Sequence, residues 1–330
     1  MTPFARGWLP ITIGLDSQSQ QAVVRWLEFG SAKLAEPFFV QTIERLRHAS
    51  PPANEAWSDL ETLLKLAEGL PPVTPAGFIF HVSRCGSTLI ANALKTADRA
   101  VVVSEAPPLS ILLHPDSYSF GPSVDTWDRM RQALFRALIS IFAHYRGDEP
   151  APVVIKFPSW NILFWSLVRS YWPHVPAIVI IRNPVEVMMG NLNGGGWMEF
   201  KKSPELAGRL FGWENLPRSV EEMSGSEFAA RVLRSFYRCA REMADQGARI
   251  LDYQDIDARQ IRAIAAFFQV DLPASCFPIE RIFGVYSKDA DSVQPFQPDG
   301  PRKQKLATGL VRSAAHQWAT AAYRNLKSRC

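Results

Sequence analysis

Five short apolar runs, rich in β-branched and aromatic residues, recur after residue 77 and constrain the fold more than any other feature. They span residues 78–82, 101–103, 153–155, 177–181 and 249–253. Segments with helical apolar spacing lie between and after them, most clearly at 127–145 and 228–243. Apolar strands that alternate with amphipathic helices indicate βαβ units, so we expect an α/β fold of three layers around a mostly parallel sheet. Ligands in such folds bind beyond the carboxyl ends of the strands.

The first 72 residues have a different character. Apolar residues at 22, 23, 26 and 27, and again at 60, 63, 64 and 66, fit helical spacing, and proline pairs at 51–52 and 71–72 end the two segments. We therefore expect an N-terminal helical extension over 1–72 that packs on an α/β domain over 73–330, with no candidate site in the extension.

Composition excludes several classes of function. The net charge of +4 is too small to indicate nucleic-acid binding, and Arg302, Lys303 and Lys305 form only a short basic cluster. No apolar stretch reaches the ~20 residues of a membrane span, and residues 1–15 do not resemble a secretory signal. The four cysteines show no metal-ligand spacing. These features predict a cytoplasmic protein with reduced thiols and no metal.

The first candidate site follows the run at 78–82. The segment Ser83-Arg84-Cys85-Gly86-Ser87-Thr88 leads directly into a predicted helix. Backbone N–H groups around the glycine, the two hydroxyls and the arginine can together form a cradle for an anion. An ATP-binding P-loop requires a lysine after its second glycine and another glycine five residues before it; Ser87 and His81 stand there. A plain strand-turn-helix junction is the alternative.

A second candidate site follows the run at 177–181. Arg182-Asn183-Pro184 places an arginine at the end of a strand, just before a helix that starts at proline. This position suits an anion ligand, and a surface ion pair is the alternative.

Together these segments resemble the family of PAPS-dependent sulfotransferases, where PAPS is 3′-phosphoadenosine-5′-phosphosulfate. An R-S-G-T-T loop in that family, like residues 84–88 here, holds the 5′-phosphosulfate. The arginine of an R-D-P segment, like Arg182, holds the 3′-phosphate, and the tyrosine of Y-E-D-L, like Tyr253, lies near the adenine. The resemblance runs from about residue 77 to the C-terminus. It implies a P-loop-like sulfotransferase fold and transfer of a sulfuryl group from PAPS to a small-molecule or peptide acceptor, leaving PAP (3′,5′-bisphosphoadenosine).

The chain departs from the family at three positions. Gly190 stands where the family has a serine for the 3′-phosphate, so Arg302 or Lys303 from a late basic segment is the expected substitute. The family's K-T-H becomes Lys156-Phe157-Pro158, which loses the histidine base and keeps the lysine, expected to neutralise the bridging oxygen or the transferred sulfuryl group. Asn183 replaces an aspartate, with an effect expected only on local hydrogen bonds.

The loss of the histidine leaves the general base open. Glu105 directly follows the run at 101–103, and other branches of the family, including tyrosylprotein sulfotransferases, are similar in using a glutamate at a comparable place. An apolar cleft is expected to raise the pKa of Glu105 toward neutrality. His114 is the alternative base, and His81 is expected to be a hydrogen-bonded core residue.

Other interpretations stay open. A nucleotide-dependent kinase and a non-catalytic relative that binds PAP or another nucleotide are the alternatives to a sulfotransferase. Residues 287–288 and 296–305 are expected to form a late loop over the cofactor. Gly194-Gly195-Gly196 beside Trp197 suits either an acceptor gate or a flexible connection. Nothing in the sequence indicates the acceptor or the oligomeric state.

Overall fold

The computed structural model describes residues 6–49, 54–121, 123–213, 219–273, 277–289, 291 and 293–330. At its centre lies a five-stranded sheet with the order β5-β6-β4-β7-β8, and all neighbouring strands run parallel. Its strands are β4 (Gly77–His81), β5 (Val101–Ser104), β6 (Val153–Lys156), β7 (Ala177–Ile181) and β8 (Arg249–Asp252). The α/β fold and all five predicted strands are confirmed.

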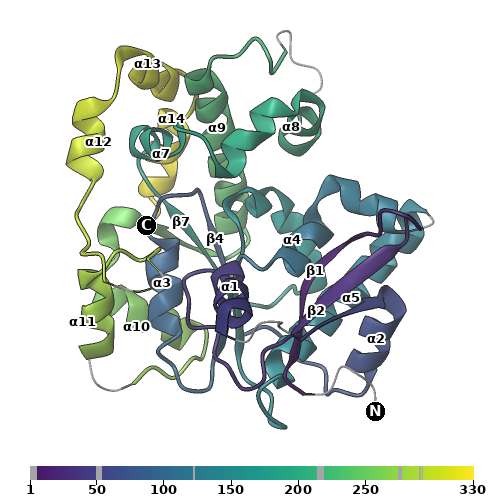
Figure 1. Cartoon of the computed structure of the whole chain (residues 1–330). Helices are drawn as coiled ribbons and strands as arrows, with labels where there is room; N and C mark the ends of the chain where they lie inside the picture. Colours follow the sequence, from purple (N-terminus) through teal and green to yellow (C-terminus); the bar gives the residue numbers. More distant parts are fainter. Residues whose placement is uncertain are drawn as a thin grey trace.

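Helices cover both faces of this sheet (Figure 1). Every residue of β4, β5, β6 and β7 is buried, and successive strand residues point to opposite faces, so the sheet is the middle of three layers. The helices of this part of the chain are α3 (Ser87–Leu94), α4 (Pro107–Leu113), η1 (Pro115–Phe120), α5 (Val124–His144), η2 (Ser159–Phe164), α6 (Trp165–Tyr171), α7 (Pro184–Asn191), η3 (Gly196–Lys202), α8 (Pro204–Phe211), α9 (Gly225–Asp245), η4 (Tyr253–Asp255), α10 (Ala258–Phe267), α11 (Phe277–Gly284), α12 (Gly300–Leu306), α13 (Gly309–Trp318) and α14 (Thr320–Lys327).

The prediction of an all-helical N-terminal extension is wrong. Strands β1 (Trp8–Leu15), β2 (Ala22–Glu28) and β3 (Glu55–Asp59) form a separate antiparallel sheet, and only α1 (Phe39–Ala49) and α2 (Leu60–Glu68) are helical. Val24 and Trp26 are buried two residues apart, which is the strand period hidden within a spacing that also fits a helix. β1 packs against α4, and α2 packs against α5. The boundary at residue 72 stays a prediction.

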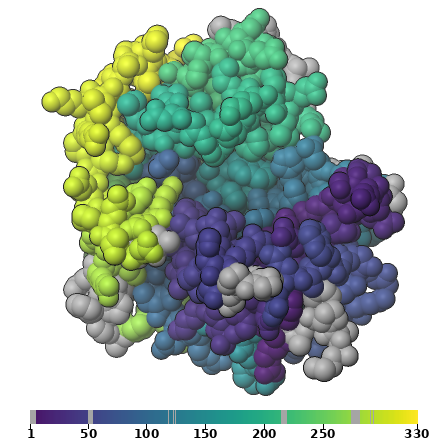
Figure 2. Space-filling view, in the orientation of Figure 1, coloured from purple at the N-terminus to yellow at the C-terminus, as the bar shows by residue number. Residues whose placement is uncertain are grey.

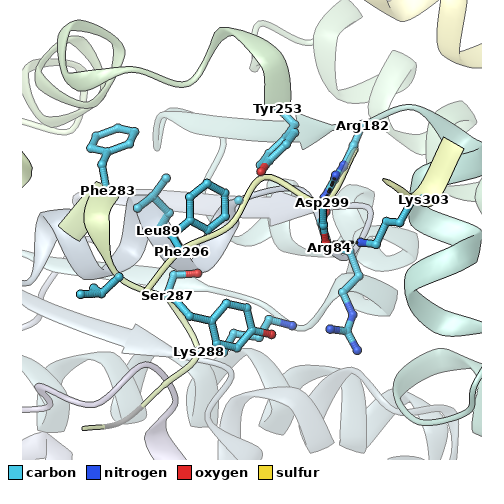
Figure 3. A pocket seen from close by; sticks show the side chains of 13 residues that line it. Arg84, Leu89, Arg182, Tyr253, Phe283, Ser287, Lys288, Phe296, Asp299 and Lys303 are labelled. Carbon is cyan, nitrogen blue, oxygen red and sulfur yellow. Dashed lines mark hydrogen bonds and ion pairs between the residues drawn. The ribbon is translucent and has the colours of Figure 1, made fainter. Parts of the chain in front are cut away.

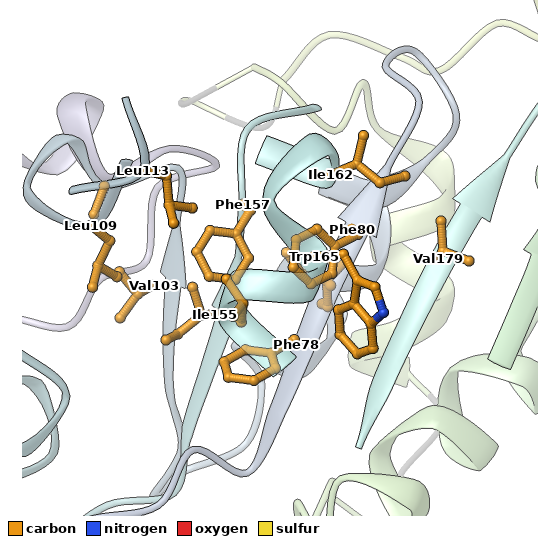
Figure 4. Close-up of a cluster of buried hydrophobic side chains, with 14 of the residues drawn as sticks. Phe78, Phe80, Val103, Leu109, Leu113, Ile155, Phe157, Ile162, Trp165 and Val179 are labelled. Atoms are coloured by element: carbon orange, nitrogen blue, oxygen red, sulfur yellow. The ribbon is translucent and has the colours of Figure 1, made fainter. Parts of the chain in front are cut away.

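An aromatic cluster beneath the sheet makes the carboxyl ends of its strands rigid (Figure 4). The rings of Phe80 and Phe157 stack with centroids 4.8 Å apart, and Trp165 meets Phe80 edge-on at 5.6 Å. All three are at least 98% buried. Because Phe80 and Phe157 adjoin His81 and Lys156 in sequence, this packing fixes where those two polar side chains emerge.

Two further sequence features can be placed. Among the described residues Cys85 and Cys239 are buried free thiols and Cys330 is an exposed one, while Cys276 lies outside them. No helix in the described part is long and apolar enough to cross a membrane.

Candidate functional site: a cationic pocket at the carboxyl edge of the sheet

The loop after β4 is built as an anion cradle would be. Ser83, Arg84 and Gly86 have positive φ angles of 76°, 52° and 81°, and Gly86 precedes the first turn of α3. A Cβ on Gly86 would lie 2.9 Å from Ile256 and 3.1 Å from the Tyr253 ring, so only glycine fits. Left-handed backbone at non-glycine residues costs free energy and often marks functional sites.

Arg182 joins this loop to the far end of the chain. It emerges from the end of β7, and its Nη1 donates a 2.7 Å hydrogen bond to the Arg84 carbonyl oxygen. Its Nε donates to the Glu186 carboxylate at 2.8 Å and its Nη2 to Asp299 at 2.6 Å. The Tyr253 ring lies 4.0 Å from the guanidinium carbon. Arg182 is 97% buried, and the carboxylates of Glu186 and Asp299 balance its buried charge.

Gly190 and Lys303 lie together beside Arg84. A Cβ on Gly190 would be 3.0 Å from Arg84 Cγ and 3.2 Å from Lys303 Nζ, so the missing serine leaves room for the lysine. Lys303 Nζ pairs with Asp299 at 2.6 Å. Of the two expected substitutes, Lys303 therefore reaches the site, while Arg302 is exposed on α12 and does not line the cavity.

These groups surround one cavity of about 90 Å³, which is smaller than the roughly 300–1,000 Å³ typical of small-molecule sites. Figure 3 shows aromatic side chains at one end and cationic ones at the other. Five residues predicted for the donor site line it, and Phe283, Lys288, Phe296 and Asp299 are among the other residues of its wall. The five predicted residues are Arg84, Gly86, Arg182, Tyr253 and Lys303.

Residues of the predicted late loop thus line this cavity, as Lys288, Phe296 and Lys303 show. Cys85, Ser87 and Thr88 are buried within the cradle loop and do not line the cavity; burial raises the pKa of Cys85 to about 11. Asp299 belongs to the predicted late loop but was not expected as a site residue, and Phe283 was not predicted. The signal for Asp299 was its position one turn before Lys303 in a proline- and glycine-rich stretch.

Three titratable groups meet where β4, β5 and β6 end. Lys156 Nζ, which is fully buried, donates a hydrogen bond to Glu105 Oε1. His81 Nε2 lies 3.5 Å from the same oxygen, and its Nδ1 accepts a 3.1 Å hydrogen bond from the Ser83 N–H. Glu105 itself has a strained φ of 55°. Lysine, carboxylate and imidazole therefore form one cluster.

The electrostatics of this cluster correct two expectations. Burial alone would raise the pKa of Glu105, but the Lys156 ammonium and His81 outweigh it and hold that pKa down at about 2. The expected rise toward neutrality is therefore wrong. Burial, together with the Lys156 charge, lowers the pKa of His81 to about 4. His81 is buried as predicted, but its Nε2 makes no hydrogen bond within the described part of the chain, so it is not a fully hydrogen-bonded core residue.

His114, the alternative base, lies at the end of α4. Its Nδ1 accepts a 3.2 Å hydrogen bond from the Asp116 N–H, and its ring packs edge-on against Trp160 at 5.8 Å. Like Glu105 and Lys156, it does not line the cavity that Arg84 and Arg182 share.

Comparison with solved structures gives a consistent set of neighbours. The sulfotransferase domain of the curacin biosynthetic pathway is 14% identical, with 78% of this chain and 98% of that one covered at a TM-score of 0.43. A mouse sulfotransferase complexed with PAP is 9% identical, with 82% and 94% covered at 0.39. The neighbours are sulfotransferases. A further one, from Mycobacterium avium, is 10% identical, with 78% and 81% covered at 0.40.

No protein-family model and no curated protein sequence matches the chain. The TM-scores of these neighbours are all below 0.5 and their identities below 25%, so none of their roles is carried over to this chain.

Proposed function

We propose that the chain transfers a sulfuryl group from PAPS to a hydroxyl or amine of an acceptor. The observation that carries the proposal is the convergence of Arg84, Arg182 and Lys303 with Tyr253 on one cavity at the carboxyl edge of the sheet. Such a donor set fits a nucleotide that carries anionic groups at two positions, because charged donors bind phosphate and sulfate oxygens strongly.

The residues divide into two ends of this donor site. Tyr253 and the apolar wall would hold the adenine, and Arg182 with Lys303 would hold the 3′-phosphate. Arg84 and the N–H groups around Gly86 would hold the 5′-phosphosulfate. Lys303 takes the place of the absent serine in this proposal, which the proximity of its Nζ to Gly190 supports.

PAPS supplies an activated sulfur, whose bond to the 5′-phosphate oxygen breaks as a bond to the acceptor oxygen or nitrogen forms. Lys156 would neutralise the charge that grows on the leaving oxygen. Glu105 would take the acceptor's proton, because its low pKa keeps it deprotonated at neutral pH. When Lys156 shares its charge with the donor, its hold on Glu105 weakens, and the carboxylate becomes a stronger base.

Ligand-induced thermal stabilisation tests the donor assignment. PAP should raise the melting temperature of the wild-type chain, whereas ATP with Mg²⁺ should raise it less at equal concentration. Stabilisation by ATP with Mg²⁺ and not by PAP would favour a kinase. PAP binding without consumption of PAPS across a broad acceptor panel would favour a non-catalytic relative.

A further inference from the structure

Lys288 is a cation in the cavity wall that has no role in the reaction proposed above. It lies in the loop between α11 and α12 and lines the wall near Arg84 (Figure 3). Within the described residues no carboxylate lies in ion-pair distance of Lys288 or of Arg84, although Arg182 and Lys303 are both paired. A partly buried cation without a counter-ion indicates a place that an anionic ligand fills.

The backbone of this loop is anchored at two consecutive carbonyl groups. Asn92 of α3 donates a 2.9 Å hydrogen bond to the Ser287 carbonyl oxygen. Gln41 of α1 donates a 3.4 Å bond to the Lys288 carbonyl oxygen, and the same amide accepts a 3.0 Å bond from the Phe38 N–H. One glutamine thus ties the N-terminal segment to the late loop, and the anchored carbonyl belongs to the lysine itself.

The Phe38 ring joins the two lysines. Its centroid lies 5.3 Å from Lys156 Nζ and 5.8 Å from Lys288 Nζ, within the range where a ring attracts a cation. Since Lys156 also pairs with Glu105, this shared ring links Lys288 to the pair at which transfer would occur. Figure 2 shows a hollow near the middle of this face of the molecule. The N-terminal segment, in purple, forms its lower border, and teal residues lie above it.

Several titratable and charged groups around Lys288 influence its pKa. Burial lowers its pKa to about 8, as do Arg84 and Lys156, whereas Glu105 and Cys85 act in the opposite direction. The ammonium therefore keeps its proton at neutral pH but lacks a compensating partner, and a bound anion would raise its pKa again.

We propose that Lys288 is a further catalytic residue that contacts the sulfuryl oxygens of the donor, and that Gln41 and Phe38 are positioning residues that hold it there. This inference rests on the proposed function. As the bond from sulfur to the leaving phosphate oxygen breaks and the bond to the acceptor forms, Lys288 stays protonated and balances the charge on the sulfuryl oxygens. The N-terminal segment thereby becomes part of the active centre.

Binding of PAPS against PAP separates a contact with the sulfuryl group from a contact with the rest of the nucleotide. Lys288→Met should weaken PAPS about 10- to 100-fold, as loss of a charged hydrogen bond would, and leave the PAP affinity within about twofold. Lys288→Arg should restore most of the PAPS affinity. Lys305→Met, at an exposed lysine of α12, is the matched control and should change neither.

A double-mutant cycle tests the positioning role. Gln41→Ala should weaken PAPS and lower kcat, and the double variant with Lys288→Met should be no worse than Lys288→Met alone, because both changes remove one interaction. Gln18→Ala, on an exposed turn, is the control. Additive effects would show that Gln41 acts independently of Lys288 and would overturn its positioning role. In the wild type, PAPS affinity should fall as pH rises above about 8, and this fall should be absent in Lys288→Met.

The two proposals fail differently. A wild-type chain that binds PAP and PAPS, with a Lys288→Met variant that binds both equally well, overturns the role of Lys288 and leaves the proposed function intact. A folded wild-type chain that binds neither nucleotide overturns both.

Discussion

Asp299 Oδ1 accepts a 2.6 Å hydrogen bond from Arg182 Nη2, while its second oxygen lies 2.6 Å from Lys303 Nζ. One carboxylate therefore bridges the two cations that we assign to the 3′-phosphate. These cations, together with hydrogen bonds, outweigh the effect of burial and lower the pKa of Asp299, so it is charged at neutral pH. In the proposed complex the 3′-phosphate would therefore compete with the Asp299 carboxylate for Arg182 and Lys303, and Asp299 would have to give up these contacts when the ligand binds.

Asp299→Asn should therefore bind PAP more tightly than the wild type. The amide keeps the shape of the side chain but no longer competes for Arg182 and Lys303, so we expect a gain of about 3- to 30-fold, or roughly 0.6–2 kcal/mol. The melting temperature without ligand should fall, because two ion pairs are weakened. Titration calorimetry with PAP measures the first effect, and weaker binding would mean that Asp299 supports the site.

Arg182→Ala should have the opposite effect on PAP. The guanidinium would make a charged hydrogen bond to the 3′-phosphate, so its loss should weaken PAP by about 1.5–3 kcal/mol. The variant also removes the ion pair of Glu186 and one of the two ion pairs of Asp299, which keeps Lys303. Arg329→Ala, which removes an exposed pair with Asp245, is the control, and an unchanged PAP affinity in Arg182→Ala would reject the assignment.

Restoring the family's serine at Gly190 should not improve binding. The new Cβ would lie 3.0 Å from Arg84 Cγ and 3.2 Å from Lys303 Nζ, which is closer than comfortable contact, so both cations must shift. Gly190→Ser should therefore weaken PAP severalfold. Calorimetry on the pair Gly190→Ser and Gly190→Ser/Lys303→Met is informative. Recovery of affinity in the double variant would show that the serine replaces the lysine, whereas tighter binding in the single variant would contradict the predicted crowding of Arg84 and Lys303.

The parallel sheet was predictable because its strands are buried on both faces and so appear as unbroken apolar runs, as in Ala177–Ile181. The N-terminal sheet was not. Ala22–Glu28 has both the helical spacing 22, 23, 26, 27 and the alternating pair Val24 and Trp26, and only its pairing with β1 and β3 decides between them.

Some residues of the candidate site could likewise be predicted from the sequence, and others could not. Arg84, Gly86 and Arg182 were predictable because they lie in the segments that follow β4 and β7, and parallel strands bring their carboxyl ends together. Asp299 and the contact of Phe38 with Lys156 join residues more than 100 positions apart. No local pattern encodes such a contact, and the pKa of Glu105 depends on one of these long-range partners, Lys156.

Glu105→Gln should slow turnover without affecting nucleotide binding. The amide cannot take the acceptor's proton, so we expect kcat to fall about 10²- to 10⁴-fold, while PAP affinity stays within about twofold. Glu61→Gln, at an exposed glutamate paired with Lys65, is the control. PAPS consumption with any accepted substrate is the measurement, and a normal rate would remove Glu105 from the mechanism and return attention to His114.

Acid should destabilise the fold through His81 before it protonates Glu105. The pKa of His81 in the folded chain is lowered from 6.5 to about 4. The unfolded chain therefore binds a proton at His81 at a higher pH than the folded chain does. Unfolding free energy is lost as the pH falls from about 6.5 to about 4. Glu105 loses its own contribution only between about 4.5 and 2. From pH 6.5 to 4.5 the wild type should therefore lose about 2–3 kcal/mol of unfolding free energy through His81. Urea unfolding measures it, and His81→Gln should flatten the slope while His174→Gln, at an exposed histidine, keeps it. An equally steep slope in His81→Gln would contradict the burial of an uncharged imidazole beside Lys156.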